Sequence, residues 1–509
     1  MSSLVERYSE QICCTLGCLD RVVLTGTLPG VCHSEGMSLY LHKHEILLKD
    51  YPRFMEPLRD ELRQHIEAIA AAEGIEIEFI RSVTAFRKEA RVQQVLQERK
   101  VEAGTVGIVH IFSAMETCST FRYHYDKPSG RNTLRADTSK CLHYYVYFLH
   151  ETFGLCYLRI PTWAPFRLQF YANGHNYLAL QLKKEAIDFA QLDNTFARIT
   201  DAKRAQEIAD AFPVEALHRE LDALVTRLCP YIGRFENTYH WSLMQVEYSS
   251  DIVFKKQEEL APLYQALVHT AIHAVKPENV ATFLGRKLHG NYEDELGNDF
   301  HTRIEGTRIK HHMGAASLKM YDKQGIVLRI ETTVNDVSFF KHYRTVEHRD
   351  GSKEQKVAPM KKSIYSLPAL TEIMRASNRR YLAFLSELAD PTAGVKKVEQ
   401  LSTPAQLGDR TYRGFNLFAA QDLNLFTTLL RGEVALGVLR NAWLRRHLTG
   451  CTGPQVSRML KRLHVHGLIK KVGKTYRYHL TERGREIAAT ALKLRELVVI
   501  PSLAHLLPA

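Results

Sequence analysis

The sequence predicts a multidomain protein of the α/β plus α+β class, with a mixed-sheet N-terminal domain, a central antiparallel-sheet domain and a small C-terminal domain rich in helix. The chain has 509 residues, more than one hydrophobic core usually organises, and 45% of them are hydrophobic, enough for several cores. Helical and strand patterns are interleaved in the first third, whereas strand patterns follow one another in the centre. The predicted parts are a mixed α/β domain over 1–185, a helical connector over 186–235, an α+β domain over 236–350, a helical spacer over 351–410 and the C-terminal domain over 411–509.

Two helices and five strands account for most of the predicted N-terminal domain. Apolar residues recur at helical spacing through Leu58, Leu62 and Ile66, and Gly74 marks the expected end of this helix. A second, basic helix is expected from about residue 86 to 100. The strands are predicted from alternating or continuous apolar runs, namely IEIEFI, VGIVHIF, CLHYYVYFLH, LCYLRI and FRLQFYANG.

A polar segment, METCSTFRYHYDKPSGRNTLRADTSK, separates the second and third of these strands and predicts a long loop. It interleaves cations with aromatic residues, among them Arg122 and Tyr123. Such a composition suits contact with nucleic acid, because aromatic rings stack on bases while cations hold phosphates. The alternative is an ordinary solvated loop with partly packed tyrosines.

The centre of the chain predicts a β-hairpin over residues 317–333, SLKMYDKQGIVLRIETT. A loop of only residues 324–325 would mix apolar and charged side chains on both faces of the sheet. A three-residue loop over 323–325, with its glycine in a left-handed bulge, instead pairs Met320 with Leu328 and leaves one face apolar. We therefore expect the three-residue loop.

In that register the opposite face of the hairpin collects charged and polar side chains by strict alternation. We call this the charged sheet face, and with the preceding strand it comprises Arg308, Lys310, His312, Ser317, Lys319, Tyr321, Arg329, Glu331 and Thr333. Its cations predict contact with an anionic partner, through Arg308, Lys310 and Arg329 in particular. The alternative is a solvated face with weak cross-strand ion pairs.

Two strings in this hairpin, KMYDK and LRIE, resemble the lysine, tyrosine, lysine and Leu-Arg-x-Glu pattern of some phage and plasmid replication initiators. In that family a tyrosine attacks a DNA phosphate beside a bound metal. The resemblance implies that Tyr321 is the nucleophile and that Lys319 or Lys323 stabilises the developing charge. The family's His-hydrophobic-His motif has no counterpart in this domain. In a metal-dependent nuclease, Glu331 would be the candidate carboxylate and Mg²⁺ the cofactor.

From about residue 415 onward the patterns predict two helices, a third helix ending at Gly467, a short two-stranded wing and a last helix. The strings LHVHGLI and YHLTERG resemble the end of the recognition helix and of the wing in the MarR-like winged-helix family. The resemblance implies a winged-helix domain that binds nucleic acid. Apolar residues predict the inward face of this segment, and they are Val456, Leu460, Leu463, Leu468 and Ile469. The outward face is then expected to meet base edges and phosphates, whereas wing cations reach the backbone. The candidates are Gln455, Ser457, Arg458, Lys461 and Arg462 on the helix and Lys470, Lys471, Lys474 and Arg477 on the wing.

The overall charge supports a polyanionic partner, because 68 lysines and arginines against 56 acidic residues give a net charge of +12. No signal-peptide pattern and no apolar run of membrane-spanning length is found, so a cytoplasmic protein is expected. Cys13, Cys14, Cys18 and Cys32 could be zinc ligands, but their spacing fits no common CxxC pair, and buried free thiols are the commoner outcome.

Three functional hypotheses follow. A DNA-binding protein of regulatory or mobile-element type has the strongest support, since it uses the C-terminal motif and a second basic surface on the central sheet. A metal-dependent nuclease or nickase is the first alternative, and an RNA-binding component of a ribonucleoprotein is the second. The choice between DNA and RNA, the recognised site and the oligomeric state are left open by the sequence.

Overall fold

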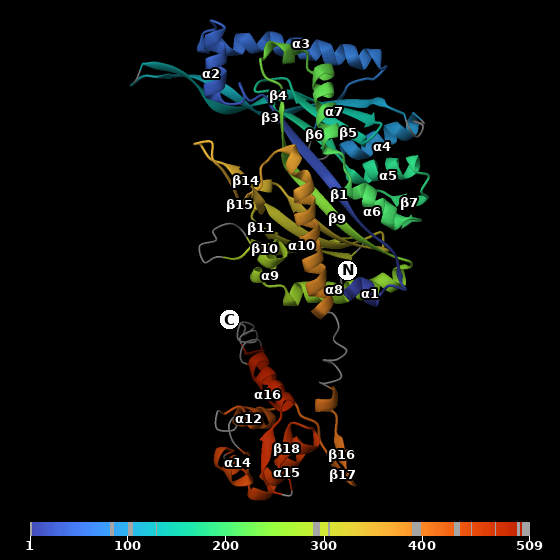
Figure 1. Ribbon diagram of the computed structural model, residues 1–509, viewed down its shortest axis with the longest axis vertical. Helices are drawn as coiled ribbons and strands as arrows, with labels where there is room; N and C mark the ends of the chain where they lie inside the picture. Colours follow the sequence, from blue (N-terminus) through green and yellow to red (C-terminus); the bar gives the residue numbers. More distant parts are fainter. Residues whose placement is uncertain are drawn as a thin grey trace. The chain divides into compact units, whose positions relative to one another are not determined.

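The computed structural model describes residues 3–81, 86–99, 105–128, 130–288, 296–303, 306–388, 399–431, 438–448, 450–473, 475–495 and 499–500. The chain forms two compact units, Met1–Ala389 and Asp390–Ala509, called here the N-terminal unit and the C-terminal unit. The first is built on an eleven-stranded sheet, and the second combines helices with two small hairpins (Figure 1). The predicted mixture of helices with a mixed sheet is confirmed, but the mixed sheet and the antiparallel sheet predicted for separate domains form one sheet.

One sheet runs through the N-terminal unit in the strand order β10-β11-β12-β13-β9-β1-β6-β5-β4-β3-β2. Neighbouring strands are antiparallel, except for β2 and β3, which are parallel. The strands are β1 (Ile12–Thr27), β2 (Glu78–Ile80), β3 (Gly107–Asp126), β4 (Arg131–His150), β5 (Gly154–Pro161), β6 (Leu168–Ala172), β9 (His240–Phe254), β10 (Leu296–Arg303), β11 (Gly306–Met313), β12 (Ala316–Lys323) and β13 (Val327–Val334).

The two halves of this sheet follow a common order of elements. In each half a long strand, β1 or β9, is followed by helices and then by an antiparallel meander, β3 to β6 or β10 to β13. The last strand of each meander pairs with the long strand of its own half, and β1 and β9 pair with each other at the centre. No such repeat is visible in the sequence patterns.

The predicted boundary between a domain over 1–185 and another over 236–350 does not divide the sheet, because β1 and β9 are neighbours in it. The predicted connector over 186–235 packs onto the same unit as the hairpin β7 (Phe189–Leu192) and β8 (Thr195–Ile199) and the helices α6 (Ala202–Asp210) and α7 (Val214–Leu228). Part of the predicted spacer over 351–410 also belongs here, as helix α10 (Leu367–Leu388) and as β15 (Lys353–Pro359), which forms a hairpin with β14 (Lys341–Glu347).

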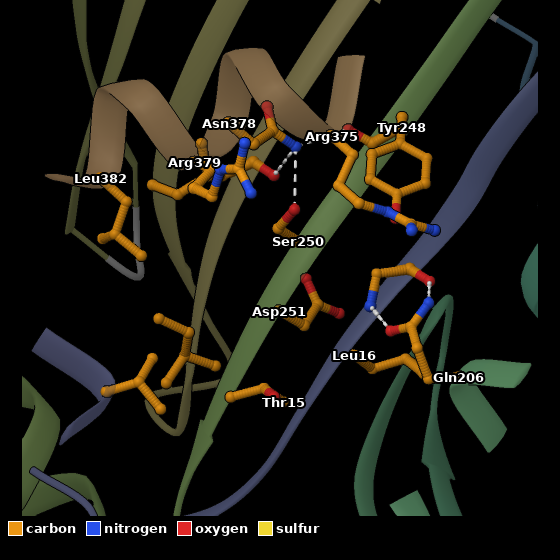
Figure 2. A pocket seen from close by; sticks show the side chains of 14 residues that line it. Thr15, Leu16, Gln206, Tyr248, Ser250, Asp251, Arg375, Asn378, Arg379 and Leu382 are labelled. Carbon is orange, nitrogen blue, oxygen red and sulfur yellow. Dashed lines mark hydrogen bonds between the residues drawn. The ribbon is translucent and has the colours of Figure 1, made fainter. Parts of the chain in front are cut away.

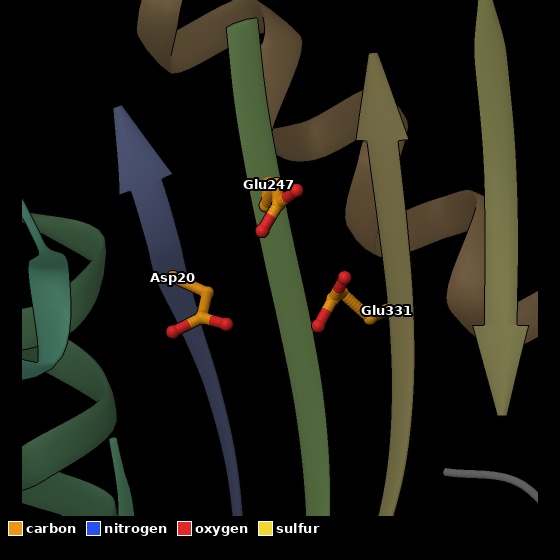
Figure 3. A group of neighbouring side chains, drawn as sticks. All are labelled: Asp20, Glu247 and Glu331. Atoms are coloured by element: carbon orange, nitrogen blue, oxygen red, sulfur yellow. The ribbon is translucent and has the colours of Figure 1, made fainter. Parts of the chain in front are cut away.

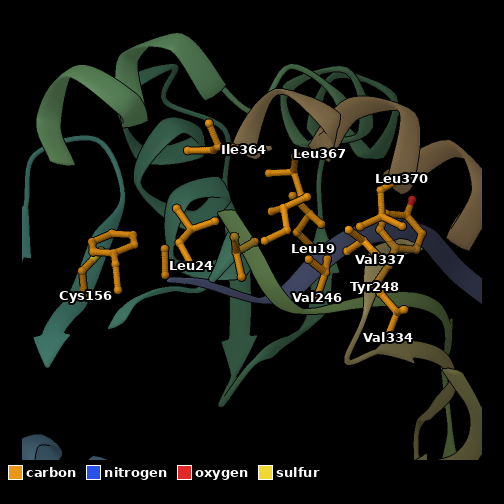
Figure 4. Close-up of a cluster of buried hydrophobic side chains, with 14 of the residues drawn as sticks. Leu19, Leu24, Cys156, Val246, Tyr248, Val334, Val337, Ile364, Leu367 and Leu370 are labelled. Carbon is orange, nitrogen blue, oxygen red and sulfur yellow. The ribbon is translucent and has the colours of Figure 1, made fainter. Parts of the chain in front are cut away.

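Helices cover the apolar face of the sheet. Leu367 and Leu370 of α10 lie in the same buried cluster as Leu19 of β1 and Val246 of β9 (Figure 4). Within the described residues, no helix combines the length and the apolar composition that crossing a membrane requires. The remaining helices of this unit are α1 (Ser3–Arg7), α2 (Ser34–Lys43), α3 (Tyr51–Ala72), α4 (Lys88–Glu98), α5 (Gly174–Lys184), α8 (Gln257–Ala274) and α9 (Pro277–Phe283), and α10 spans Leu367–Leu388.

The hairpin of β12 and β13 has the predicted faces in a shifted register. Met320 pairs with Ile330 rather than with Leu328, and the loop consists of residues 324–326. A shift by two residues preserves the alternation, so every side chain stays on the face predicted for it. Gly325 has a φ of +75°, the left-handed conformation expected for the loop glycine.

The segment predicted as a long loop after β3 is instead part of a β-ribbon. β3 and β4 pair without interruption from Met115 and Leu142 to Asp126 and Arg131 at the turn. The prediction was wrong because Gly, Ser and charged residues lower strand propensity only weakly when a ribbon is exposed on one face.

The C-terminal unit contains β16 (Ala405–Leu407), β17 (Arg410–Tyr412), α12 (Ala420–Leu429), α14 (Asn441–His447), α15 (Gly453–Val465), β18 (Ile469–Lys471), β19 (Tyr478–Leu480) and α16 (Glu482–Leu494). The predicted recognition helix corresponds to α15, and the predicted wing to β18 and β19. Ahead of α14, Leu439 forms a bridge with Tyr478 of the wing. The string VALGVLRNAWLRRHL predicts a helix throughout, so the bridge at Leu439 differs from that prediction.

Candidate nucleic-acid interface and buried charge cluster

A groove of about 930 Å³ in the C-terminal unit is lined by α15, the wing and the hairpin of β16 and β17. Among its described lining residues the only carboxylate is that of Asp422. Cationic and aromatic side chains make up about half of the rest, and they are Arg410, Tyr412, Arg413, Arg458, Lys461, Arg462, Lys471, Tyr476 and Tyr478. The groove therefore has the chemistry that suits a polyanion.

The sequence fixes helix α15 at its start and along its inner side. Thr452 is the N-cap, Pro454 occupies the first turn, and Gln455 completes a capping box by accepting a hydrogen bond from the Thr452 backbone N–H at 2.7 Å. Val456, Leu460 and the other predicted inward residues, Leu463, Leu468 and Ile469, are all buried. The inward face of the helix is thereby confirmed.

Arg462 differs from the prediction that it faces nucleic acid, because its side chain is buried. Its Nη1 and Nη2 donate to Asp422 Oδ1 and Oδ2 at 2.7 and 2.9 Å, and Nε donates to the Arg413 carbonyl at 3.0 Å. The guanidinium also lies 3.8 Å over the Phe415 ring. Arg462 thus joins α15 to α12 and to the chain after β17. Its positive charge also neutralises Asp422, the one carboxylate among the described residues that line the groove.

The other predicted contact residues of this unit reach solvent. Gln455, Ser457 and Arg458 are exposed and Lys461 is half-buried on α15, while Lys470, Lys471 and Arg477 are exposed on the wing. Lys474 lies outside the described residues. The structure adds Arg410, Tyr412 and Arg413, which sequence reasoning missed because no hairpin was predicted at the border between the helical spacer over 351–410 and the C-terminal domain over 411–509.

The charged sheet face of the N-terminal unit is only partly exposed: Arg329, Glu331 and Thr333 are buried, and its other six residues are half-buried. His175 of α5 and Asn194, in the turn between β7 and β8, lie against Arg329. Arg329 has no exposed surface, and its Nε and Nη2 donate to Asp251 Oδ1 and Oδ2 at 2.7 and 2.6 Å. Nη2 also donates to the Asn194 carbonyl at 2.6 Å, and Nη1 lies 3.4 Å from Asp20 Oδ2. Arg329 is therefore unavailable to a nucleic acid in this structure.

Three carboxylates converge on this face, from Asp20 on β1, Glu247 on β9 and Glu331 on β13 (Figure 3). One oxygen of each lies within 4.8 Å of the others. Asp20 reaches the group because it is the extra residue at an irregularity of β1, where Leu19 and Arg21 pair with consecutive residues of β9. Sequence reasoning selected Glu331 alone, since the partners come from strands far away in the chain.

Cations and a tyrosine surround these carboxylates. Lys319 Nζ donates to Glu331 Oε1 at 2.5 Å and lies 3.8 Å from Glu247 Oε1. The Tyr321 hydroxyl donates to Glu331 Oε2 at 2.8 Å. The predicted catalytic residues Glu331, Tyr321 and Lys319 are thus brought together, in a network whose charges nearly balance.

The surroundings shift the pKa values of Glu247 and Asp20 in opposite directions. Burial and the neighbouring charge of Glu331 raise the pKa of Glu247, and the positive charges of Lys319 and Arg21 oppose this only in part. Burial also acts to raise the pKa of Asp20, but the hydrogen bond and charge of His175 and the charge of Arg329 outweigh it and lower the pKa. His175 Nδ1 lies 3.3 Å from Asp20 Oδ1. Asp20 is therefore held as an anion, whereas Glu247 is the easier of the two to protonate.

The remaining predicted contacts are spread over the N-terminal unit. Arg308 and Lys310 are half-buried on β11, where Lys310 lies 3.8 Å from Asp299. Arg122 and Tyr123 are exposed on β3. Within the described residues, the three carboxylates are the one group of three or more His, Cys, Asp or Glu ligand atoms that converge, and Cys13, Cys14, Cys18 and Cys32 are free thiols.

A separate pocket of about 310 Å³ lies on the other face of the sheet, beneath α10 (Figure 2). Its lining is mostly apolar, with Arg375 and Arg379 contributed by the helix. Arg375 donates to the Tyr248 hydroxyl at 2.8 Å, and Asn378 donates to Ser250 Oγ at 3.1 Å. These bonds join α10 to β9 along one side of the pocket.

Comparison with known proteins returns no protein-family model, no curated protein and no solved structure that matches this chain.

Proposed function

We propose that this protein binds nucleic acid through the groove of the C-terminal unit, with duplex DNA as its preferred partner. The observation that carries the proposal is the gathering of cations from three separate chain segments along one concave surface whose only described carboxylate is paired with Arg462. The order of α12, the Leu439 bridge, α14, α15, the wing and α16 supports the resemblance to winged-helix proteins.

In this proposal α15 lies in the major groove. Gln455, Ser457 and Arg458 are the exposed side chains on its N-terminal half, the part that meets base edges in helix-turn-helix docking. Asn441 donates to Ser457 Oγ at 2.7 Å and so holds it in position. Lys461 and Lys471 contact phosphates, and the exposed ring of Tyr476 packs against the sugar-phosphate backbone.

The test is fluorescence anisotropy of full-length protein with a duplex of about three helical turns, over a series of salt concentrations. The triple variant Arg458→Ala, Lys461→Ala, Lys471→Ala is expected to lose at least about 100-fold in affinity and to lower the salt slope by about 3. Arg485→Ala is the matched control, because Arg485 is an exposed cation of the same unit outside the groove. Equal binding by the triple variant and the control would refute the proposal.

A second candidate function, metal-dependent cleavage of a phosphodiester, is favoured by the convergence of Asp20, Glu247 and Glu331. Carboxylate oxygens are the ligands that Mg²⁺ prefers, and these three residues would hold the ion. A bound Mg²⁺ would polarise a phosphate oxygen. Lys319, between Glu331 and Glu247, would add a positive charge beside the phosphate.

Cleavage is tested by incubating the protein with supercoiled plasmid, with and without Mg²⁺ or Mn²⁺, and comparing deproteinised samples. Nicked or linear product that requires metal and disappears in Glu331→Gln is expected if this function holds. Glu372→Gln, which changes an exposed carboxylate of α10, serves as the control. Intact plasmid in every lane, with binding retained, would exclude cleavage under these conditions and leave the first function standing.

A further inference from the structure

The ribbon formed by β3 and β4 extends beyond the sheet that it belongs to. β5 pairs with β4 only at residues 143–150, and β2 pairs with β3 only at residues 112–114. The paired segments from Met115 to Asp126 and from Arg131 to Leu142 therefore project as a two-stranded arm (Figure 1). At about 3.4 Å per residue the arm is roughly 35 Å long.

One face of this arm is braced. Phe121 and Leu134 are 7% and 5% exposed and belong to the main core cluster of the unit. The Phe121 ring lies 6.0 Å from the ring of Tyr51, the first residue of α3. The arm is thus held in a fixed direction along much of its length, and this reduces the ordering cost that a flexible hairpin would carry on binding.

The opposite face carries cations that are poorly compensated. Arg122 and Arg135 stand directly across from one another in the ribbon. Arg122 is 72% exposed and its ion pair is with Asp137 at 3.5 Å, whereas exposed Arg135 forms no ion pair with the described residues. Like charges at directly opposed positions destabilise a ribbon, so their presence is understandable if an anion comes to lie on them.

The net charge of the whole arm is also positive. Between residues 115 and 142 there are five cations, Arg122, Lys127, Arg131, Arg135 and Lys140, against three acidic residues, Glu116, Asp126 and Asp137, which leaves a net charge of +2. At the base of the arm a pocket of about 290 Å³ is lined by Arg159, exposed Arg167 and the hydroxyl-bearing residues Thr25 and Thr117. Arg159 is paired with Glu116 at 2.7 Å, so it is Arg167 that continues the cationic character of the arm onto the sheet.

From this geometry we infer that the arm is a second nucleic-acid contact, which inserts into the major groove of duplex DNA. The major groove of B-form DNA admits a two-stranded β-ribbon, whereas the deep, narrow major groove of A-form RNA does not. The inference deepens the proposed function, because it names the form of duplex that the protein prefers. Arg122, Arg131 and Arg135 contact phosphates or guanine edges, and Tyr123 and Tyr125 near the turn contact the groove wall.

The experiment compares full-length wild type with Arg122→Ala, Arg135→Ala on a DNA duplex and on an RNA duplex of the same sequence. The double variant is expected to lose about 10- to 100-fold in affinity for DNA and to lower the salt slope by about 2, with RNA affinity unchanged. Protection of guanine N7 from methylation in the DNA footprint should shrink in parallel. The matched control is Arg349→Ala, Lys353→Ala, which removes two exposed cations from the other hairpin, β14 and β15.

The outcomes separate this inference from the proposed function. Wild-type DNA affinity in the double variant would overturn the inference while leaving the C-terminal groove as the contact. Equal losses on DNA and RNA would overturn insertion into a B-form groove. Failure of the wild type itself to bind either duplex would overturn the proposed function and, with it, the inference. Thermal unfolding of the variant, expected to match that of the wild type because both arginines are exposed, verifies that the arm is still folded.

Discussion

The charged sheet face and helix α15 look alike in the sequence, since both present cations at the period of their secondary structure, yet the structure treats them differently. On the sheet face Arg329 is fully buried and bonded to Asp251, whereas on α15 Arg458 is exposed and only Arg462 is buried. Periodicity decides which side chains share a face. It does not decide whether another part of the chain covers that face.

The separation of the partners along the chain explains the difference. Arg329 lies 309 residues from Asp20 and 135 residues from Asn194, so no local pattern announces that these groups will meet. Arg462 lies 40 residues from Asp422, within the same small unit. The first error was therefore one of topology, and the second concerned a single residue at the border of an amphipathic helix.

Removing Arg329 gives the sharpest contrast between the two faces. Arg329→Ala leaves Asp251 and Asp20 buried without their main cation, and breaking a buried ion pair in this way costs about 3–5 kcal/mol. We expect the N-terminal unit to unfold at a markedly lower denaturant concentration, as measured by circular dichroism. Arg458→Ala is the control and should shift unfolding by less than about 0.5 kcal/mol. Similar stabilities of these two variants would contradict the burial contrast.

Substituting Arg462 tests whether this residue of α15 has a structural role, like Arg329 of the charged sheet face, rather than a role in binding. Arg462→Ala leaves the Asp422 carboxylate buried and should lower the stability of the C-terminal unit by about 2–4 kcal/mol. The double variant Arg462→Met, Asp422→Leu should recover most of this loss, because an apolar pair of similar volume replaces a buried ion pair at little cost. A direct contact to nucleic acid would instead give a stable single variant with weakened binding.

Lowering the pH should destabilise the N-terminal unit through the buried side chain of His311. Burial, with a smaller contribution from His312, lowers the pKa of His311 from 6.5 to about 4. In the unfolded chain His311 therefore binds a proton below pH 6.5, whereas in the folded chain it does so only below about pH 4. The free energy of unfolding falls as the pH drops through this window. At pH 5 the loss is about 2 kcal/mol. His311→Gln should flatten the dependence, and an unchanged slope would exclude His311 as its source.

The smallest effect is expected at an exposed cation of the groove. Arg458→Ala should weaken binding to duplex DNA by about 1 kcal/mol and reduce the salt slope by about 1, with no change in stability. Anisotropy titrations at several salt concentrations measure both quantities. The loss is expected to vary with the sequence of the duplex, because Arg458 lies on the part of α15 that meets base edges, and an equal loss on every sequence would assign Arg458 to a phosphate instead.

The parts of the fold that depend on local patterns could be predicted, and those that depend on distant pairing could not. The helix ending near Gly74, the inward residues of α15 and both faces of the β12 and β13 hairpin follow from period alone. No short sequence pattern predicts strand order, and three features depend on it. These are the single sheet, the convergence of Asp20 and Glu247 with Glu331, and the contact of Asn194 with Arg329. The arm was missed because a ribbon exposed on one face has the composition of a loop.

The pairing of β1 with β9 also has a consequence for biosynthesis. Thr27 and His240, which meet at one end of this pair, are separated by 213 residues of chain. At a synthesis rate of roughly 5–20 residues per second, β1 stays unpaired on the order of ten seconds or more before β9 has been synthesised. Such long-range closure slows folding and leaves an unpaired strand edge open to self-association. Expression at reduced temperature or with added chaperones should therefore raise the yield of the full chain far more than that of the C-terminal unit.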